Sequence, residues 1–222
     1  MHADSFPTRG RTLDHAAFVY DICEPVFMLG RQAAYNRMII DLLSLQKQHR
    51  VLDLGCGTGT LTRAIGDRLE AAAGGTALGI DAAAAMIQVA KKKRESTTCR
   101  FEVAAAECLP YEAASFDAVV SSLFFHHVDG DLKMRSFLEA FRVLRPGGLL
   151  IVADMHTPST LMGRLISYGA RWLLMQPEIG ENISGVLPLL MGRAGFAQPQ
   201  LHAMFFGYIA LFSTHKPGRN QS

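Results

Sequence analysis

Apolar residues fall into short runs at regular intervals from residue 50 onward, and stretches with helical periodicity separate these runs. Five runs have the composition of buried strands, namely residues 50–54, 76–80, 100–104, 116–122 and 148–153. The stretches between them predict helices over residues 58–73, 82–94 and 132–144. Strands that alternate with helices in this way build a parallel sheet covered on both faces, so we expect a doubly wound α/β fold.

The two ends of the chain carry different patterns. Near the C-terminus, the apolar runs 199–205 and 208–214 are separated by Gly207 and predict an antiparallel pair at the edge of the sheet. Before the first strand, residues 12–45 have helical periodicity. The proline and glycines of residues 145–148 are expected to end the preceding helix and release the chain into the fifth strand.

One segment interrupts the alternation. Leu161, Leu165, Trp172 and Leu173 lie at helical spacing within residues 158–176 and predict an amphipathic helix after the fifth strand. Such a helix suits three roles: packing on the core, forming a lid over a ligand cleft, or touching a lipid surface. The pattern alone leaves all three open.

Composition narrows the class of protein. The chain has 222 residues, of which 49% are hydrophobic and 19% are charged, as is typical of one globular domain. No apolar run is long enough to cross a bilayer, and the N-terminal residues do not have the pattern of a signal peptide. Cysteines stand at positions 23, 56, 99 and 108, without the density of a disulfide scaffold or the spacing of a zinc site. We therefore expect a cytoplasmic protein without a bound metal.

The charge balance argues against a nucleic-acid partner. The chain has 22 basic and 20 acidic residues, a net charge of +2, whereas phosphate binding requires a concentrated basic face. The one basic run, residues 91–94, ends a predicted helix, where cations offset the negative end of the helix dipole. We interpret this run as a solvated helix end.

The strongest chemical signal is residues 51–61, Val-Leu-Asp-Leu-Gly-Cys-Gly-Thr-Gly-Thr-Leu, in which a buried strand enters a glycine turn and then a helix. Glycines in such a turn let the backbone approach a ligand closely beside a helix N-terminus. The dinucleotide-binding pattern requires a third glycine where Thr60 stands. Asp53 would repel a pyrophosphate but would suit a ligand with an ammonium or sulfonium cation.

Asp81 follows the second predicted strand, 22 residues after Gly59. An acidic residue at this strand end accepts hydrogen bonds from ribose hydroxyls in nucleotide-binding sheets. The same residue type is also a common helix N-cap. Because the glycine turn lies at the expected spacing, we favour the ribose interpretation.

These motifs resemble the class I S-adenosylmethionine-dependent methyltransferases, in particular the group that includes ubiquinone/menaquinone C-methyltransferases and phospholipid N-methyltransferases. The resemblance spans roughly residues 15–215 and is carried by residues 52–59, 79–81, 107–117 and 142–148. It implies a Rossmann-like, seven-stranded sheet with a reversed last strand, helices on both faces, and S-adenosylmethionine bound over the strand ends. It also implies an N-terminal helical cap over the active site, residues 1–45, and a cofactor-binding domain, residues 46–222, with a lid insertion at about residues 155–192.

The resemblance assigns cofactor contacts residue by residue. It implies that Gly55, Cys56, Gly57 and Thr58 hold the methionine half of the cofactor, with Asp53 near its amino group. It further implies that Asp81 binds the ribose, that Met86 packs against the adenine, and that Tyr20 closes over the cofactor. A core tyrosine is the alternative for Tyr20.

The adenine end departs from the family pattern. Relatives often carry an acidic residue where this chain has Ala105, so the side chain that commonly binds the adenine amino group is missing. We expect the amide of Ala106 to reach an adenine ring nitrogen, and Glu107 to accept from the amine. A plain strand-end glutamate is the alternative for Glu107.

The fourth predicted strand ends at Ser121 and Ser122, where the methyl group would lie. Leu123, Phe124 and Phe125 follow and predict an apolar mouth, and His126 and His127 come next. Adjacent residues point in different directions, so at most one histidine faces the acceptor. His127 is the candidate base for an acceptor hydroxyl or amine, and a structural or cofactor-edge role is the alternative.

The expected reaction is in-line methyl transfer to a small, largely hydrophobic acceptor, such as a quinone precursor, a lipid or a secondary metabolite. Two other functions remain open at this point, a nicotinamide-dependent oxidoreductase and a non-catalytic cofactor-binding partner. Asp53 and Thr60 weigh against the first, and Ala105 keeps the second open. Contact with a membrane surface is a further possibility, and the sequence does not indicate an oligomeric state.

Overall fold

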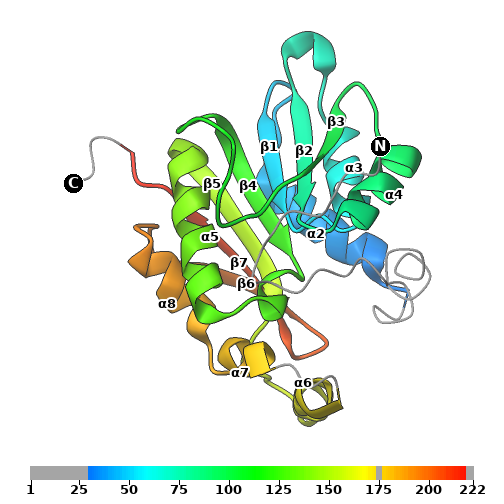
Figure 1. The fold of residues 1–222 in the computed structure, drawn as a ribbon. Coiled ribbons are helices and arrows are strands. Elements are labelled where there is room, and N and C mark those ends of the chain that lie inside the picture. Colours follow the sequence, from blue (N-terminus) through cyan, green and yellow to red (C-terminus); the bar gives the residue numbers. More distant parts are fainter. Residues whose placement is uncertain (1–29, 174–176, 219–222) are drawn as a thin grey trace.

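A seven-stranded sheet with the strand order β3-β2-β1-β4-β5-β7-β6 forms the centre of the computed structural model (Figure 1). The structure describes residues 30–173 and 177–218. The strands are β1 (Arg50–Leu54), β2 (Thr76–Asp81), β3 (Cys99–Val103), β4 (Phe116–Ser122), β5 (Leu144–Met155), β6 (Gln200–Phe205) and β7 (Ile209–His215). All seven predicted strands are therefore present.

Strand directions confirm the predicted topology. Strands β1 to β5 pair in parallel, and β7 runs antiparallel to both β5 and β6. The reversed strand is thus the last one in the chain, inserted between β5 and the edge strand β6. β5 starts earlier than predicted, because Leu144 already pairs with Phe116 before the register shifts around the proline and glycines.

Helices cover both faces of the sheet, as expected. They are α2 (Gln32–Leu43), α3 (Thr60–Gly66), α4 (Ala84–Arg94), α5 (Gly130–Val143), α6 (Leu161–Leu173), α7 (Pro177–Ile183) and α8 (Val186–Arg193), with short 3-10 turns η1 (Ala71–Ala73) and η2 (Phe125–His127). Among the described residues, no helix is both long and apolar enough to cross a membrane.

The central strands alternate their side chains between two cores. Val51 and Val120 pack with α2 and α3, whereas Leu52 and Val119 pack with α5 and α8 on the opposite face. Both faces are buried, which explains why the strands appear in the sequence as nearly continuous apolar runs.

The helix predicted over residues 58–73 is shorter in the structure. After α3 ends at Gly66, the chain turns and Glu70 becomes extended, where its backbone N–H donates to the carbonyl of Lys47 at 2.9 Å. The loop that precedes β1 therefore takes the backbone hydrogen bond that a longer helix would have kept.

The insertion predicted as a lid over residues 155–192 contains three helices with different roles. In α8, Leu187, Leu190 and Met191 are buried in the core beside α5, so this helix is part of the fold. Helix α7 packs against η2 and the end of β5. Only α6 lies apart from the sheet, at the lower end of the molecule in Figure 1.

The N-terminal cap lies mostly outside the described residues. Its described part, α2, buries Tyr35, Ile39, Ile40 and Leu43 against the sheet. This helix is therefore one layer of the main core, and residues 1–29 are not part of the description.

Candidate active site

The glycine turn after β1 forms the wall of a cavity at the carboxyl ends of the strands. Residues from β1, the turn, α3, α2 and the end of β4 line it: Gln32, Asn36, Asp53, Gly55, Cys56, Gly57, Thr58, Thr60, Leu61, Ser122 and Leu123. The turn was predicted to hold a ligand, and the structure brings six of the predicted cofactor residues together here: Asp53, Gly55, Cys56, Gly57, Thr58 and Ser122.

Two glycines of the turn adopt the left-handed conformation where no side chain would fit. Gly55 has φ of +68°, and a Cβ there would lie 2.5 Å from the ring of Phe124. Gly59 has φ of +86°, and a Cβ there would lie 2.3 Å from the ring of Phe101 on β3. Bare backbone thus passes between aromatic rings on its way from β1 to α3.

Asp53 is a buried carboxyl at the floor of the cavity. Its Oδ2 accepts a hydrogen bond of 2.6 Å from the Thr62 hydroxyl of α3. Burial, with a smaller contribution from the charge of Asp81, raises the pKa of Asp53 to about 7, although the Thr62 hydrogen bond opposes the rise. A cationic ligand beside this group would supply the missing counter-charge.

Asp81 joins the second strand to the glycine turn. Its Oδ2 accepts from the backbone N–H of Gly57 at 3.0 Å, and its Oδ1 accepts from the N–H of Ala83, next to α4, at 2.8 Å. The carboxylate therefore orders both loops that surround a nucleotide in folds of this type. The N-cap residue of α4 is Ala83, so Asp81 lies two residues before the cap position considered for it from the sequence.

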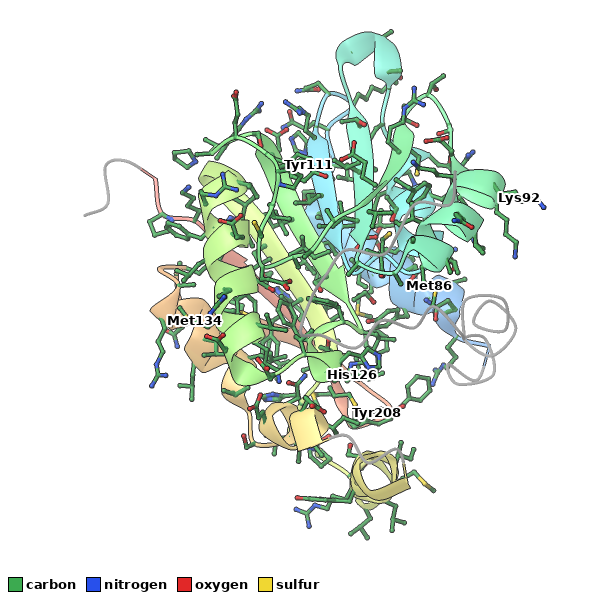
Figure 2. All side chains as sticks on the ribbon, viewed as in Figure 1. Met86, Lys92, Tyr111, His126, Met134 and Tyr208 are labelled. Carbon is green, nitrogen blue, oxygen red and sulfur yellow. The ribbon has the colours of Figure 1, made fainter. Side chains whose placement is uncertain are left out.

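The predicted adenine residues follow the neighbouring strands. Met86 on α4 (Figure 2), Ala105 and Ala106 are buried, and Glu107 is half-buried. The backbone N–H of Ala104 donates to the carbonyl of Asp81 at 3.1 Å, so this loop adjoins the end of β2.

Helix α2 contributes residues that the sequence did not single out. Gln32 and Asn36 line the cavity and bond to each other at 3.0 Å. Gln32 Oε1 is buried and has no hydrogen-bond partner among the described residues. The signal for these residues was the i, i+4 spacing of two neutral polar side chains on α2. Tyr20 lies outside the described residues.

Two serines end β4 in different environments. Ser121 is fully buried, and its hydroxyl donates to the carbonyl of Leu54 at 3.1 Å, so that side chain is used within the sheet. The Ser122 hydroxyl lies 2.8 Å from the Tyr35 hydroxyl and lines the cavity. Of the predicted pair, Ser122 is therefore the one that presents its side chain to the cavity.

The apolar mouth predicted from residues 123–125 is smaller than expected. Phe125 is fully buried and stacks on Phe137 of α5, so it belongs to the core. Phe124 packs beside Gly55, and Leu123 lines the cavity with φ of +54°, a strained value for leucine. This sharp turn leads into η2, whose first residue, Phe125, enters the core.

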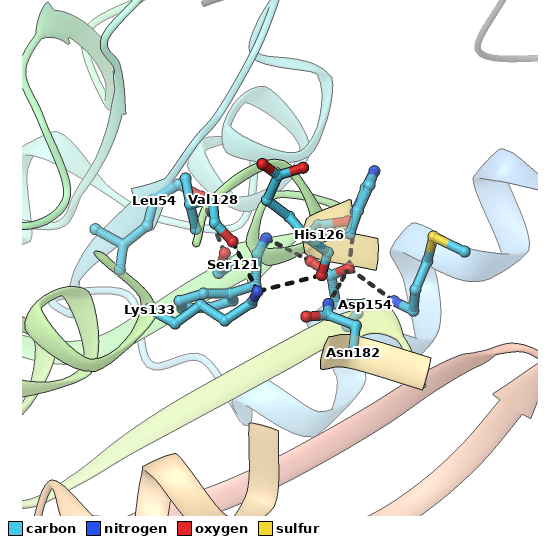
Figure 3. Close-up of polar contacts among 12 residues, drawn as sticks. Leu54, Ser121, His126, Val128, Lys133, Asp154 and Asn182 are labelled. Carbon is cyan, nitrogen blue, oxygen red and sulfur yellow. Dashed lines mark hydrogen bonds and ion pairs between the residues drawn. The ribbon is translucent and has the colours of Figure 1, made fainter. Parts of the chain in front are cut away.

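A second buried carboxylate, Asp154, lies at the end of β5 and holds His126 (Figure 3). His126 Nδ1 is 2.8 Å from Asp154 Oδ1, and the imidazole remains partly exposed. The carboxylate also accepts from the N–H of Phe125 at 2.6 Å, the N–H of Met155 at 2.7 Å and the Asn182 amide at 3.3 Å. Burial alone would raise the pKa of Asp154, but His126, the Met155 N–H and His127 hold that pKa below its ordinary value.

His127 takes a different position from its neighbour. The His127 ring lies against the His126 ring, with centroids 3.9 Å apart, and the backbone N–H of His127 donates to the carbonyl of Phe124 at 3.0 Å. The direct carboxylate contact belongs to His126. Among residues 30–173 and 177–218, no cluster of three potential ligands is arranged to hold a metal ion.

Lys133 is fully buried and fixes the elements around the histidines. Its ammonium donates to the carbonyl of Val128 at 2.7 Å and to the Glu181 carboxylate at 2.5 Å. It thereby joins α5, the end of the histidine turn and α7 (Figure 3). Nothing in the local sequence pattern marks this lysine as buried.

Comparison with known proteins identifies the family. Residues 51–148 match a family described as a methyltransferase domain. The ubiquinone/menaquinone biosynthesis C-methyltransferase UbiE of Pseudomonas paraeruginosa is 31% identical over 226 aligned residues, covering 89% of this chain and 84% of that protein. The chain belongs to the class I S-adenosylmethionine-dependent methyltransferases. The nicotinamide-dependent and non-catalytic alternatives are therefore set aside.

Two further comparisons concern a second sequence relative of this methyltransferase and a solved structure with the same fold. A demethylmenaquinone methyltransferase of Renibacterium salmoninarum is 32% identical, over 66% of this chain and 58% of that protein. The phosphoethanolamine N-methyltransferase 2 of Haemonchus contortus, solved with S-adenosyl-L-methionine, has a TM-score of 0.68 at 17% identity, covering 92% of this chain and 57% of that one. The second comparison shows that the fold is shared.

The described residues of this methyltransferase fit its cofactor, S-adenosylmethionine. The cavity offers a buried carboxyl, Asp53, and a buried acceptor without a partner, Gln32 Oε1, both suited to an ammonium group. The glycine turn beside them lines the same cavity while its backbone packs against the Phe124 and Phe101 rings.

Gly59→Ala tests the packing of the turn. The new Cβ would combine left-handed strain of about 1–2 kcal/mol with overpacking of about 1–3 kcal/mol against Phe101. Gly147→Ala is the matched control, because Gly147 has φ of +79° but no atom near its Cβ position. Urea denaturation should show the larger loss of unfolding free energy for Gly59→Ala. Equal losses would mean that the Phe101 ring moves aside at little cost in free energy.

Proposed function

We propose that this methyltransferase methylates a ring carbon of a small, hydrophobic, hydroxylated quinol. The observation that carries the proposal is the alignment with the Pseudomonas UbiE protein, which extends over 89% of this chain and therefore includes the acceptor side as well as the cofactor turn. The Renibacterium relative bears a demethylmenaquinone methyltransferase name, which supports the same acceptor class.

For the cofactor we propose the contacts that the family resemblance implied. Asp53 would face the amino group, and residues 55–58 would hold the methionine half. Asp81 would bind the ribose, with Met86, Ala106 and Glu107 around the adenine beside Ala105. Ser122 completes the cavity beside Leu123, and Tyr20 remains the proposed closing residue. Free thiols at Cys56, Cys99 and Cys108 support a reducing, cytoplasmic setting.

We assign the proton acceptor to His126 in place of the predicted His127. An ionised carboxylate only accepts hydrogen bonds, so contact with Asp154 fixes the proton of the neutral imidazole on Nδ1. The lone pair of Nε2 is then available on the other side of the ring. Asp154 acts as a positioning residue that selects this tautomer and would stabilise the protonated ring.

The proposed step is proton removal coupled to carbon attack. The chemistry that the bound cofactor supplies is a methyl group on a positively charged sulfur. His126 Nε2 takes the proton of the acceptor hydroxyl, which raises electron density at the adjacent ring carbon. That carbon would accept the methyl group, which leaves its bond to the cofactor sulfur, and the ring would then release its C–H proton to solvent as protonated His126 returns a proton to the ring oxygen. The enzyme contributes alignment, exclusion of water and one positioned base.

Binding of S-adenosylmethionine should release a proton from Asp53. With a pKa of about 7, Asp53 is largely protonated at pH 6, and a cation beside it favours the ionised form, so affinity should rise with pH through neutrality. Isothermal titration calorimetry in buffers of different ionisation enthalpy should detect nearly one proton released at pH 6.

Two variants control the calorimetry. Asp53→Asn should abolish the proton release and weaken binding by about 1–3 kcal/mol. Thr62→Val removes the hydrogen bond that lowers the Asp53 pKa, so proton release should persist to higher pH. Proton release that is unchanged in Asp53→Asn would show that the cofactor cation lies elsewhere.

The two adjacent histidines offer a matched test of the base. His126→Gln should lower kcat/KM for a reduced, short-chain demethylmenaquinone by about 100-fold or more, whereas His127→Gln should keep most of the activity. Added imidazole should partly restore His126→Ala, and cofactor affinity should stay near that of the parent protein. If the loss follows His127 instead, the assignment to His126 is wrong.

The acceptor class is tested directly with labelled cofactor. Incubation of the enzyme with trideuteromethyl S-adenosylmethionine and either reduced demethylmenaquinone or a phosphatidylethanolamine vesicle should label only the quinol. Tandem mass spectrometry should locate the label on a ring carbon. Label in the lipid headgroup, or on a quinol oxygen, would contradict the proposal while leaving the family assignment in place.

A further inference from the structure

Helix α6 is built with its large apolar side chains on the outside. Gly163 and Ser167, one helical turn apart, are buried on its inner face. Its exposed side chains are Leu161 (79% exposed), Leu165 (71%), Met162 (65%), Tyr168 (45%) and Ile166 (40%). In Figure 2 the side chains of this helix project away from the sheet. The arrangement reverses the usual amphipathic pattern of a surface helix.

The attachment of α6 to the fold does not use these apolar side chains. A Cβ on Gly163 would lie 2.6 Å from the carbonyl of Gly207, so helix and β6–β7 turn approach through bare backbone. Before the helix, the N–H of Ser159 donates to the same carbonyl at 2.8 Å, and the Thr160 hydroxyl accepts from the N–H of Gly163 at 3.0 Å. The outer face is therefore not needed to hold the helix in place.

The segment that contains α6 carries charges of one sign. Residues 158–177 contain Arg164 and Arg171 but no aspartate or glutamate. The described arginine, Arg164, is exposed on α6. Cations beside a broad apolar face are the pattern of a helix that rests in the headgroup region of an anionic bilayer.

The size of the face distinguishes a lipid surface from a protein partner. At 1.5 Å per residue, a helix with the length of α6 is about 20 Å long and about 10 Å wide, a footprint of roughly 200 Å². Stable protein interfaces bury about 800 Å² on each partner. The helix stands apart at one end of the molecule and is suited to a flat surface.

We propose that α6 docks this protein on an anionic lipid bilayer, with the exposed leucines and methionine among the acyl chains and Arg164 at the phosphates. Beyond the fold itself, the proposal uses only the exposure, attachment and charge of α6. It does not depend on which acceptor is methylated.

The chain carries a built-in reporter for this contact. Trp172 is the single tryptophan of the sequence and belongs to α6. Full-length protein mixed with vesicles of phosphatidylglycerol and phosphatidylethanolamine should show a blue shift of tryptophan emission and quenching by brominated acyl chains. Pure phosphatidylcholine vesicles should give a clearly smaller response, and added salt should weaken binding to the anionic vesicles.

Matched variants separate α6 from other exposed apolar residues. The double variant Leu161→Ser with Leu165→Ser should weaken vesicle binding at least tenfold in co-sedimentation, and Arg164→Glu should weaken it selectively on anionic vesicles. Leu189→Ser is the control, since Leu189 is an exposed leucine on α8, and it should bind like the parent protein. None of these residues lines the cofactor cavity.

Three outcomes would overturn the proposal. The parent protein could fail to bind vesicles, or the double variant could bind them as tightly as the parent protein. Sedimentation velocity could instead show self-association of the parent protein that the double variant abolishes. The last result would assign the face to a second copy of the chain. If the parent protein does not bind vesicles and its tryptophan emission is already blue-shifted and protected from quenching without lipid, the apolar face of α6 is covered by another segment of the same chain.

Discussion

The parallel pairing of β1 with β4 is the constraint on which the site depends. Leu54 lies opposite Ser121 in this register, so both strands end at the same edge of the sheet. The chain leaves β1 into the glycine turn and leaves β4 into the turn that carries the histidines. The glycine turn and the histidine turn therefore lie at the same edge because two strands end together, although they are about 70 positions apart in the sequence.

The two buried carboxyls at this edge illustrate how surroundings decide the chemistry of one residue type. Asp53 has a single hydroxyl donor, and its pKa is raised to about 7. Asp154 collects two backbone N–H groups, an amide and a histidine, and its pKa is lowered. Asp53 lacks a positively charged partner and suits a cationic ligand, whereas the hydrogen bonds of Asp154 come from the protein itself and hold the His126 ring in one orientation.

The sequence predicted the sheet and the cofactor turn well, because both depend on local patterns. Alternating apolar residues such as Val51 and Leu52 mark a strand buried on both faces, and Gly55 to Gly59 mark a turn. The distinction between His126 and His127 could not be predicted in this way. It depends on Asp154, which lies 28 positions away and contacts one ring only after β5 has aligned with β4.

The structure also differs from the sequence-based prediction at residues whose type suits two roles. Phe125 fits an apolar mouth and a core equally well by type, and only its stacking on Phe137 settles the matter. The segment after β5 was similar, since the apolar residues of α8 belong to the core and those of α6 do not. Hydrophobicity alone does not say which surface a residue will meet.

The backbone contact between α6 and the β6–β7 turn has a mechanical consequence. Gly207 meets the start of α6, and the next residue, Tyr208, accepts a hydrogen bond at its carbonyl from His156, directly after β5. A load on α6 would thus be transmitted through one hairpin to the strand end that carries Asp154. Tilting α6 would therefore displace the carboxylate that holds the His126 ring.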